Sequence, residues 1–411
     1  LYMHGGCSHI DSWDHKPSLF RRDGELLPDS INTGRNKFNQ SLQKIMQPAW
    51  KFRQHGQSGL WGSELFRETN TRMDDLCFLY SMYSNNNAHT PATLELHTGS
   101  QSLMRPSIGS WVSYGLGALN RDLPAYIVLT SRATAGGAQP LYSRLWDSGF
   151  LPAEHSGVKL RNTGDPVYYL HNPPGIDRDT RRDILDDVGA LNRKRHAVVG
   201  DPAIESRIAQ YEMAFRMQAS VPELADISKE PEHVLKLYGP NVGKQGTFAR
   251  NCLVARRLAE RDVRFIQLFH MGWDQHEKLT EALPRQCRDT EQPVAGLITD
   301  LKQRGLLKDT LVVWGGEFGR TIYAQKPGNK AGRDHHPRCF TQMLAGAGVK
   351  NGHVHGETDD YCYNVARDPV HVHDLNATLM HLLGVDHEKL TFKFQGRDYR
   401  LTDVHGKVVK E

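Results

Sequence analysis

Five loops of this sequence combine glycine with side chains that can bind a metal ion or transfer a proton. They offer carboxylate oxygens and imidazole nitrogens, and that mixture suits Zn²⁺, Mn²⁺ or a related divalent ion. The loops span residues 4–11, 87–93, 272–276, 315–320 and 332–336. The candidate metal ligands that they contain are Asp11, Asp274, His276, Glu317 and His335.

One or two divalent cations are the cofactor that these residues predict, with Zn²⁺ or Mn²⁺ preferred and Ca²⁺ or Mg²⁺ as alternatives. Two ions about 4 Å apart would hold both the attacking and the leaving oxygen of a displacement at phosphorus or sulfur. The glycines beside Glu317 let the backbone turn sharply and let a substrate approach closely.

Several segments have the apolar composition of short strands, among them 125–129, 263–269 and 310–314. Helical patterns alternate with them: one over 248–261 leads into the strand at 263, and Asp374 can cap another. Alternating strands and helices predict an α/β fold with a mostly parallel sheet. Because ligands collect beyond the carboxyl ends of such strands, we expect the five loops to converge in one pocket.

The region from about 130 to 244 is rich in Arg, Asp, Pro and Gly, and only 180–196 and 203–219 have helical patterns. We interpret it as an insertion that covers one end of the sheet, within a single domain of residues 1–411. The opening residues 1–6 read as the end of a strand that enters a glycine turn, with no start Met and no leader. We therefore expect a chain that is truncated close to its first strand.

The composition is that of an ordinary globular enzyme, with 411 residues of which 38% are hydrophobic and 24% charged. The formal charge is +4 without a dense Lys/Arg block, so nucleic acid is not an expected partner. No apolar run approaches the ~20 residues that span a bilayer. Six cysteines without a CxxC pair argue against a zinc ribbon or a thioredoxin site.

Three long motifs give the sequence a family resemblance. They are GGCSHIDSWDHKP at 5–17, VRFIQLFHMGWDQH at 263–276, and the run from WGGEFGRT at 314 through GRDHHP to GVKNGHVHGETD at 348–359. With these motifs the sequence resembles the domain of unknown function 1501 family of the alkaline-phosphatase-like superfamily, whose bacterial members are often labelled sulfatases. The resemblance covers nearly the whole chain. It implies an alkaline-phosphatase-like sandwich, a central mostly parallel sheet flanked by helices, and a periplasmic or secreted location.

The resemblance also implies roles for individual residues. Asp11 matches the superfamily's Asp after the first strand, Asp274 and His276 match its middle Asp and His, and His335 matches its last metal His. Glu317-Phe318-Gly319 matches an Asp-His-Gly motif, but Phe318 cannot bind a metal. One of two metal sites therefore loses a ligand unless His336, His9 or Asp14 compensates, and a single-metal site stays open.

The nucleophile is the second departure from the superfamily. Its sulfatases carry Cys-x-Pro-x-Arg before a Thr-Gly, whereas alignment on Thr98-Gly99 places His89-Thr90-Pro91-Ala92-Thr93 there. The Cys and the Arg are absent, so a formylglycine mechanism is not supported and no cysteine, Cys7 included, is expected to be catalytic. Thr90 is the nearest hydroxyl, and His89 could be a nucleophile, a base or a ligand. The alternative is that Thr90 merely caps a helix and that metal-bound hydroxide attacks.

Arg320 and Arg333 are the groups that could bind an anionic substrate, because a guanidinium matches phosphate or sulfate oxygens; a salt bridge with Glu317 or Asp334 is the alternative. The function that we predict is metal-dependent hydrolysis of a phosphate or sulfate ester. The substrate is a small anionic ester, with a sulfated or phosphorylated carbohydrate as one form. Two alternatives stay open: a metal-dependent phosphotransferase or mutase with a covalent intermediate on Thr90, and a non-catalytic exported binding protein.

Overall fold

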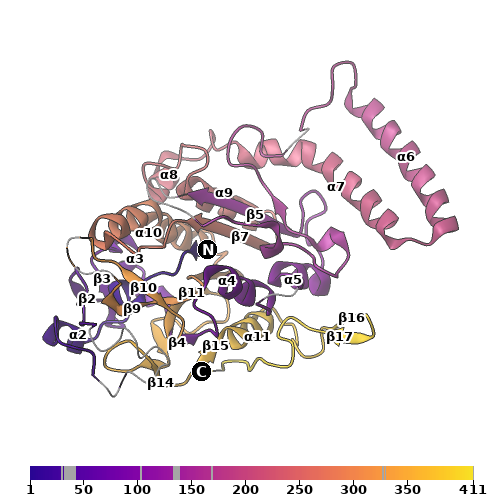
Figure 1. Ribbon diagram of the computed structural model, residues 1–411. Helices are drawn as coiled ribbons and strands as arrows, with labels where there is room; N and C mark the ends of the chain where they lie inside the picture. The colour runs from indigo at the N-terminus through magenta and orange to yellow at the C-terminus, as the bar shows by residue number, and fades with distance from the viewer. Residues whose placement is uncertain are drawn as a thin grey trace.

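A parallel sheet of four strands lies at the centre of the fold (Figure 1). The computed structural model describes residues 1–28, 31, 43–101, 104–132, 139–167, 170–325, 328 and 330–410. The strand order is β1 (Tyr2–His4), β7 (Phe265–Met271), β5 (Tyr126–Arg132) and β6 (Val158–Lys159), and every neighbouring pair is parallel. The predicted α/β class with a central parallel sheet is confirmed.

A second, mixed sheet continues from the first. Its order is β12 (His353–His355), β4 (Leu76–Tyr83), β11 (Phe340–Gly346) and β8 (Leu311–Trp314), and β15 (Val370–His371) also pairs with β4. The N-H of Met3 donates to the carbonyl of Gly315 at 2.8 Å, so β1 lies against the end of β8. This contact brings the loops after β1, β7 and β8 to one place.

Helices cover both faces of the parallel sheet in Figure 1. On one side lie α8 (Glu232–Tyr238), α9 (Phe248–Ala259) and α10 (Leu279–Gln303), and on the other α4 (His89–Thr98), α5 (Ile108–Leu116) and α11 (Val372–Leu382). The predicted helix at 248 begins where the Thr247 hydroxyl accepts from the N-H of Arg250. Its buried residues Phe248, Leu253 and Leu258 anchor it on the sheet.

The predicted insertion holds the most projecting part of the molecule. Its two predicted helices are present and longer than expected, as α6 (Arg178–Val199) and α7 (Pro202–Ala225), and they form a hairpin that projects from the body (Figure 1). Strand β6 also falls inside 130–244, where it pairs with β5 as the fourth strand of the sheet.

The remaining elements are short. They are α1 (His9–Ser12), α2 (Pro17–Arg21), α3 (Arg67–Asn70), β2 (Phe52–His55), β3 (Leu60–Ser63), β9 (Gly319–Ala324), β10 (Arg333–His336), β13 (Glu357–Thr358), β14 (Val365–Arg367), β16 (Phe392–Phe394), β17 (Arg397–Tyr399) and the 3-10 turns η2 (Met73–Asp75), η3 (Ser143–Leu145) and η4 (Ala153–His155). Among the described residues no helix has the length and apolar character that a membrane crossing requires.

A buried ion pair fixes the short helix α1 to the β9–β10 hairpin. Arg333 and Asp11 are both fully buried, and the guanidinium meets the carboxylate in two contacts, Nε to Oδ2 at 2.7 Å and Nη2 to Oδ1 at 3.1 Å. Arg333 also donates to the carbonyls of Met46 and Thr321, both at 3.1 Å. Removal of either partner would leave the other charge buried without compensation.

Asp11→Ala is therefore expected to lower the free energy of unfolding by about 3–5 kcal/mol. Urea denaturation followed by circular dichroism measures this change. Lys389→Ala, which breaks an exposed pair with Asp386, is the control and should change stability little. A loss in Asp11→Ala no larger than in Lys389→Ala would contradict the structural importance of the buried pair.

Candidate metal centre

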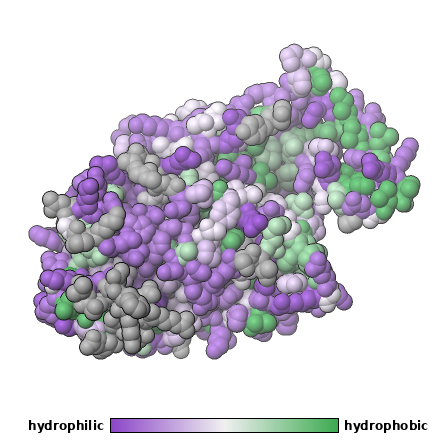
Figure 2. Space-filling view, viewed as in Figure 1, coloured by the Kyte–Doolittle hydropathy of each residue, from purple (hydrophilic) through white to green (hydrophobic). Residues whose placement is uncertain are grey.

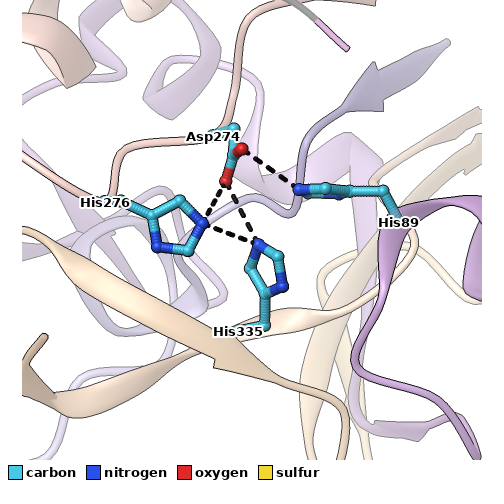
Figure 3. A group of neighbouring side chains, drawn as sticks. All are labelled: His89, Asp274, His276 and His335. Atoms are coloured by element: carbon cyan, nitrogen blue, oxygen red, sulfur yellow. Dashed lines mark hydrogen bonds and ion pairs between the residues drawn. The ribbon is translucent and has the colours of Figure 1, made fainter. Parts of the chain in front are cut away.

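Four side chains point toward a common centre in Figure 3. They are His89, Asp274, His276 and His335, and one ligand atom from each lies within 4.8 Å of the others. Asp274 and His276 come from the loop after β7, His335 from β10, and His89 is the first residue of α4. Three imidazoles and one carboxylate are a donor set that suits a divalent transition metal.

Asp274 is the hub of this cluster. Its Oδ1 lies 2.9 Å from Nε2 of His276 and 3.2 Å from Nε2 of His335, and the two imidazole nitrogens are 2.9 Å from each other. The other carboxylate oxygen, Oδ2, lies 3.1 Å from Nε2 of His89 as an ion pair that lacks hydrogen-bond geometry. Three ring nitrogens thus gather around one carboxylate, and all four groups could bind the same ion.

The outer nitrogens of two of these histidines are fixed by hydrogen bonds. Nδ1 of His89 donates to Oε1 of Glu317 at 2.7 Å, and Nδ1 of His335 donates to the carbonyl of Asn87 at 2.6 Å. Metal-binding histidines characteristically donate their second ring N-H to a carboxylate or a backbone carbonyl, which orients the ring and sets its tautomer. The residues present therefore fit a metal ion.

Glu317 forms the layer behind His89. It is fully buried, and its carboxylate accepts from the N-H of Gly5 at 3.0 Å and from the hydroxyl of Tyr2 at 2.8 Å. Burial acts to raise the pKa of Glu317, but the hydrogen bond from His89 and the nearby His4 outweigh it and lower this pKa to about 2. Glu317 is therefore an anion that His89 faces in the interior.

The charge states of the cluster follow from the same contacts. Burial acts to lower the pKa of His89, but its ion pair with Asp274 and its hydrogen bond to Glu317 outweigh burial and raise that pKa to about 9. For His335 burial prevails and the pKa is lowered, so its imidazole is neutral at pH 7. Burial opposes ionisation of Asp274, yet its close contacts with the three histidines hold its pKa far below the ordinary range. A metal cation held by these residues would need His89 to release a proton from Nε2, because an imidazole nitrogen must be deprotonated to act as a ligand.

Two of the predicted ligands lie outside the group of four. Glu317 touches it only through His89. Asp11 is held by Arg333 and accepts a hydrogen bond from the Ser8 hydroxyl at 2.5 Å, so both of its oxygens are engaged away from Asp274. The structure thus brings together three of the five predicted ligands and adds His89, which the sequence placed among the catalytic candidates.

Arg320 is a buried support of the site and does not present its guanidinium at the surface. The side chain is 1% exposed and donates to the Asp274 carboxylate at 2.6 Å and to four backbone carbonyls. These carbonyls belong to Gly5, Gly6, Trp273 and Arg333. Arg333 is likewise buried against Asp11. The salt-bridge alternative therefore describes both arginines better than substrate binding does, with Asp274 and Asp11 as the partners in place of Glu317 and Asp334.

The residues around the expected nucleophile show one further correction. Thr90 is exposed in the first turn of α4, and its carbonyl accepts from the hydroxyl of Tyr142 at 3.1 Å. The N-cap of α4 is Ala88, so the alternative that Thr90 caps this helix is wrong. The aromatic ring of Phe318 packs 5.1 Å from that of His89 and 4.5 Å from that of His335, measured between centroids.

None of the three residues that could have compensated for Phe318 reaches the cluster. His9 and His336 hydrogen-bond to the backbone carbonyls of Cys362 and Tyr363, at 3.1 and 2.6 Å. Asp14 accepts from the hydroxyl of Thr358 and pairs with Lys16 at 3.4 Å.

Comparison with known proteins assigns a family. The family described as "Protein of unknown function (DUF1501)" matches residues 1–411. The chain belongs to the DUF1501 family. A search of curated proteins finds no match for it.

Several solved structures are similar to this DUF1501 protein. Ps i-CgsB in complex with k-i-k-neocarrahexaose has a TM-score of 0.37 at 12% identity, over 78% of this chain and 66% of that one. The lipoteichoic acid synthase LtaP from Listeria monocytogenes has a TM-score of 0.38 at 11% identity, over 81% and 70%. The phosphonate monoester hydrolase SpPMH from Silicibacter pomeroyi has a TM-score of 0.32 at 12% identity, over 78% and 68%. Likeness of this degree assigns neither a substrate nor a reaction to the DUF1501 chain, so its own side chains must do so.

The cysteines of the DUF1501 chain are all buried with free thiols. Burial raises the pKa of Cys7 well above its ordinary value, with the Glu317 carboxylate adding to the effect. A thiol that stays protonated is a poor nucleophile. The absence of a catalytic cysteine stays a prediction, and it agrees with this environment.

His335→Ala is expected to weaken Zn²⁺ binding by more than about 100-fold, because changes in the layer behind the ligands alone cost 10–100-fold. Glu317→Gln changes only the group that orients His89, so it should weaken Zn²⁺ binding by about 10–100-fold. Competition with a chromogenic chelator measures both affinities. His387→Ala removes a buried imidazole that bonds Thr402 at 2.9 Å outside the cluster, and it should leave the affinity unchanged. Equal Zn²⁺ affinity in His335→Ala and His387→Ala would contradict the assigned site.

Proposed function

We propose that this protein is a metal-dependent hydrolase of phosphate or sulfate esters, with its ion held by His89, Asp274, His276 and His335. The observation that carries the proposal is the arrangement of His89 and His335. Both turn Nε2 toward the cluster while Nδ1 donates to a fixed oxygen acceptor. A bound divalent cation, Zn²⁺ or Mn²⁺ by this donor set, would polarise a phosphoryl or sulfuryl oxygen and lower the pKa of a water molecule.

The environment favours one ion over two. Asp11 and Glu317 are the two predicted carboxylate ligands that lie outside the cluster, and each is already satisfied by its neighbours. Asp11 is neutralised by Arg333, and Glu317 accepts from His89, Gly5 and Tyr2. The Phe318 ring lies against His89 and His335 and offers no ligand atom.

An anionic substrate would meet the cation and the N-terminus of α4. Since Arg320 and Arg333 are buried, the positive end of this ten-residue helix is the other feature beside the cluster that favours an anion. His89 begins the helix, so the helix end and the ligand cluster meet at one residue. A small anionic ester, such as a sulfated or phosphorylated carbohydrate, fits this electrostatic arrangement. From the family resemblance we also propose that the protein acts in the periplasm or outside the cell.

The exposed hydroxyl of Thr90, one residue from His89, supports phosphotransfer as a second candidate function. The Thr90 oxygen would attack phosphorus, its proton would pass to a base, and the ester oxygen would leave. The phosphoryl group would then pass to the hydroxyl of an acceptor and regenerate Thr90. Hydrolysis by water needs no such intermediate.

Asp274→Ala is expected to lower kcat/KM for aryl phosphates or aryl sulfates by more than about 100-fold and to lower metal content, because it removes the hub of the cluster. Assays with each divalent metal, together with elemental analysis, measure both effects. Full activity in Asp274→Ala would show that the metal assignment is wrong.

Thr90→Ala separates water attack from a covalent mechanism. Water attack should leave more than about a tenth of the activity, whereas a covalent mechanism should lose nearly all of it while metal content stays unchanged. We expect the first result, since Arg320 and Arg333 are buried in ion pairs and do not stand ready to steady a covalent intermediate on Thr90. Thr90→Ser is the matched control because it keeps the hydroxyl, and it should retain activity under either mechanism.

A further inference from the structure

The loop that joins β4 to α4, residues 84–88, reaches two of the candidate metal ligands. His89 follows this loop directly as the first residue of α4. Within the loop, the carbonyl of Asn87 accepts the hydrogen bond from Nδ1 of His335 at 2.6 Å. The loop therefore determines where one candidate ligand begins and how the ring of another is oriented.

Apolar packing does not hold this loop in place. Asn85, Asn87 and Ala88 are exposed. The side of the body that carries α4 is mainly hydrophilic in Figure 2, whereas hydrophobic residues gather on the α6–α7 hairpin at the upper right. Hydrogen bonds must therefore fix the shape of the loop. At its start, the N-H of Ser84 donates to the carbonyl of Pro337 at 2.9 Å.

Glu95 of α4 is the common acceptor for the middle of the loop. It is 3% exposed, and it accepts from Asn85 twice, from the backbone N-H at 3.3 Å and from Nδ2 at 3.0 Å. The side chain of Gln101 donates to the same carboxylate at 3.1 Å and accepts from Nδ2 of Asn86 at 3.2 Å. Asn86 in turn accepts from the N-H of Ala88 at 2.9 Å. Glu95 thus fixes two neighbouring residues of the loop, one directly and one through Gln101.

The place of Glu95 in the helix explains how it reaches the loop. It lies six residues after His89, about 9 Å along α4, and helical side chains lean toward the N-terminus of their helix. A buried carboxylate is unfavourable unless its oxygens are satisfied. Within the described part of the chain no ion pair includes Glu95, so it depends on its three hydrogen bonds. A further contact, 2.8 Å between Nδ2 of Asn85 and Nε2 of His371, joins the loop to the start of α11.

We propose that Glu95 is a positioning residue of the metal centre, because it holds the carbonyl of Asn87 where that carbonyl orients the imidazole of His335. The route runs from Glu95 to Asn85, along two residues of backbone, and then to the ring. The hydrogen bonds of Glu95 reach none of the four candidate ligands directly. This inference rests on the metal site of the proposed function and adds a residue that acts on it through the loop.

Glu95→Ala is expected to weaken Zn²⁺ binding by about tenfold, at the lower end of the range for groups that orient metal ligands. Asn85→Ala breaks the same route at an exposed position and should also weaken binding, by a smaller factor because the backbone N-H remains. Glu95→Gln keeps an oxygen that can accept from Asn85 and Gln101, so it should lose less affinity than Glu95→Ala. Competition with a chromogenic chelator measures each affinity.

Glu291→Ala is the matched control for these variants. Glu291 is also a helix carboxylate that accepts from two backbone N-H groups of another segment, those of α3, at 2.8 and 3.3 Å. Its replacement should leave the Zn²⁺ affinity unchanged. Circular dichroism at the assay temperature shows whether each variant is folded, and Asn85→Ala decides the question if Glu95→Ala is not. Wild-type affinity in every folded variant of Glu95 and Asn85 would overturn the proposal.

Double-mutant cycles identify the route. In a His335→Ala background, Glu95→Ala should have almost no further effect on Zn²⁺ affinity, because the ring that it orients is gone. In a His89→Ala background it should weaken binding by the same factor as in the wild type. A loss that disappears with His89 would mean that Glu95 acts by holding α4 itself, and it would overturn the route through Asn87.

NMR of the histidine ring nitrogens in the metal-free protein gives a readout that needs no ion. Nδ1 of His335, identified by the loss of its signal in His335→Ala, should have the chemical shift of a protonated nitrogen, because it donates to Asn87. In Glu95→Ala it should move toward the average of the two tautomers, and an unchanged shift would overturn the positioning role. Wild-type Zn²⁺ affinity in His335→Ala would instead overturn the metal site of the proposed function, and the nitrogen shift would still decide whether Glu95 positions the ring.

Discussion

A buried guanidinium joins the three chain segments on which the candidate metal centre is built. Arg320 donates to the carbonyls of the glycine turn after β1, to the loop after β7 and to β10, and it holds Asp274 by a 2.6 Å ion pair. A buried cation without these acceptors would be strongly unfavourable, so the loops must keep their places around it. Gly5 is required there, because a Cβ would lie 2.7 Å from backbone atoms of Trp273 and Asp274.

The buried ion pairs and hydrogen bonds also determine which of the predicted carboxylates are free to bind a metal ion. Arg333 neutralises Asp11, and His89, Tyr2 and Gly5 satisfy Glu317, so both are used for structure and for orienting the histidine. Asp274 remains, 15% exposed and surrounded by three imidazole nitrogens. This division of roles leaves His89, Asp274, His276 and His335 as one group that could hold a metal ion, beside the N-terminus of α4.

Much of the fold could be predicted from the sequence, because strand composition and alternating helices report local structure. Asp274 and His276 were predicted because they follow β7, a strand whose apolar run is unmistakable. The role of Asp11 could not be predicted in the same way. Its carboxylate pairs with Arg333, which is distant in the sequence, and no local pattern reports such a contact. The ligand geometry of His89 depends on how α4 packs against the sheet. The two hairpin helices α6 and α7 were predicted. The sequence did not show which of their apolar residues face solvent, because this depends on how the two helices pack on each other.

Anomalous diffraction from crystals soaked in ZnCl₂ and in MnCl₂ tests the central claim, that Arg320-anchored loops form a one-ion centre, most directly. The account predicts one peak per chain, with Nε2 of His276, Nε2 of His335 and an Asp274 oxygen at about 2.0–2.2 Å for Zn²⁺, and with Nε2 of His89 turned toward it. A strong peak bound by Asp11 or Glu317, or by residues elsewhere in the chain with the cluster left empty, would contradict it.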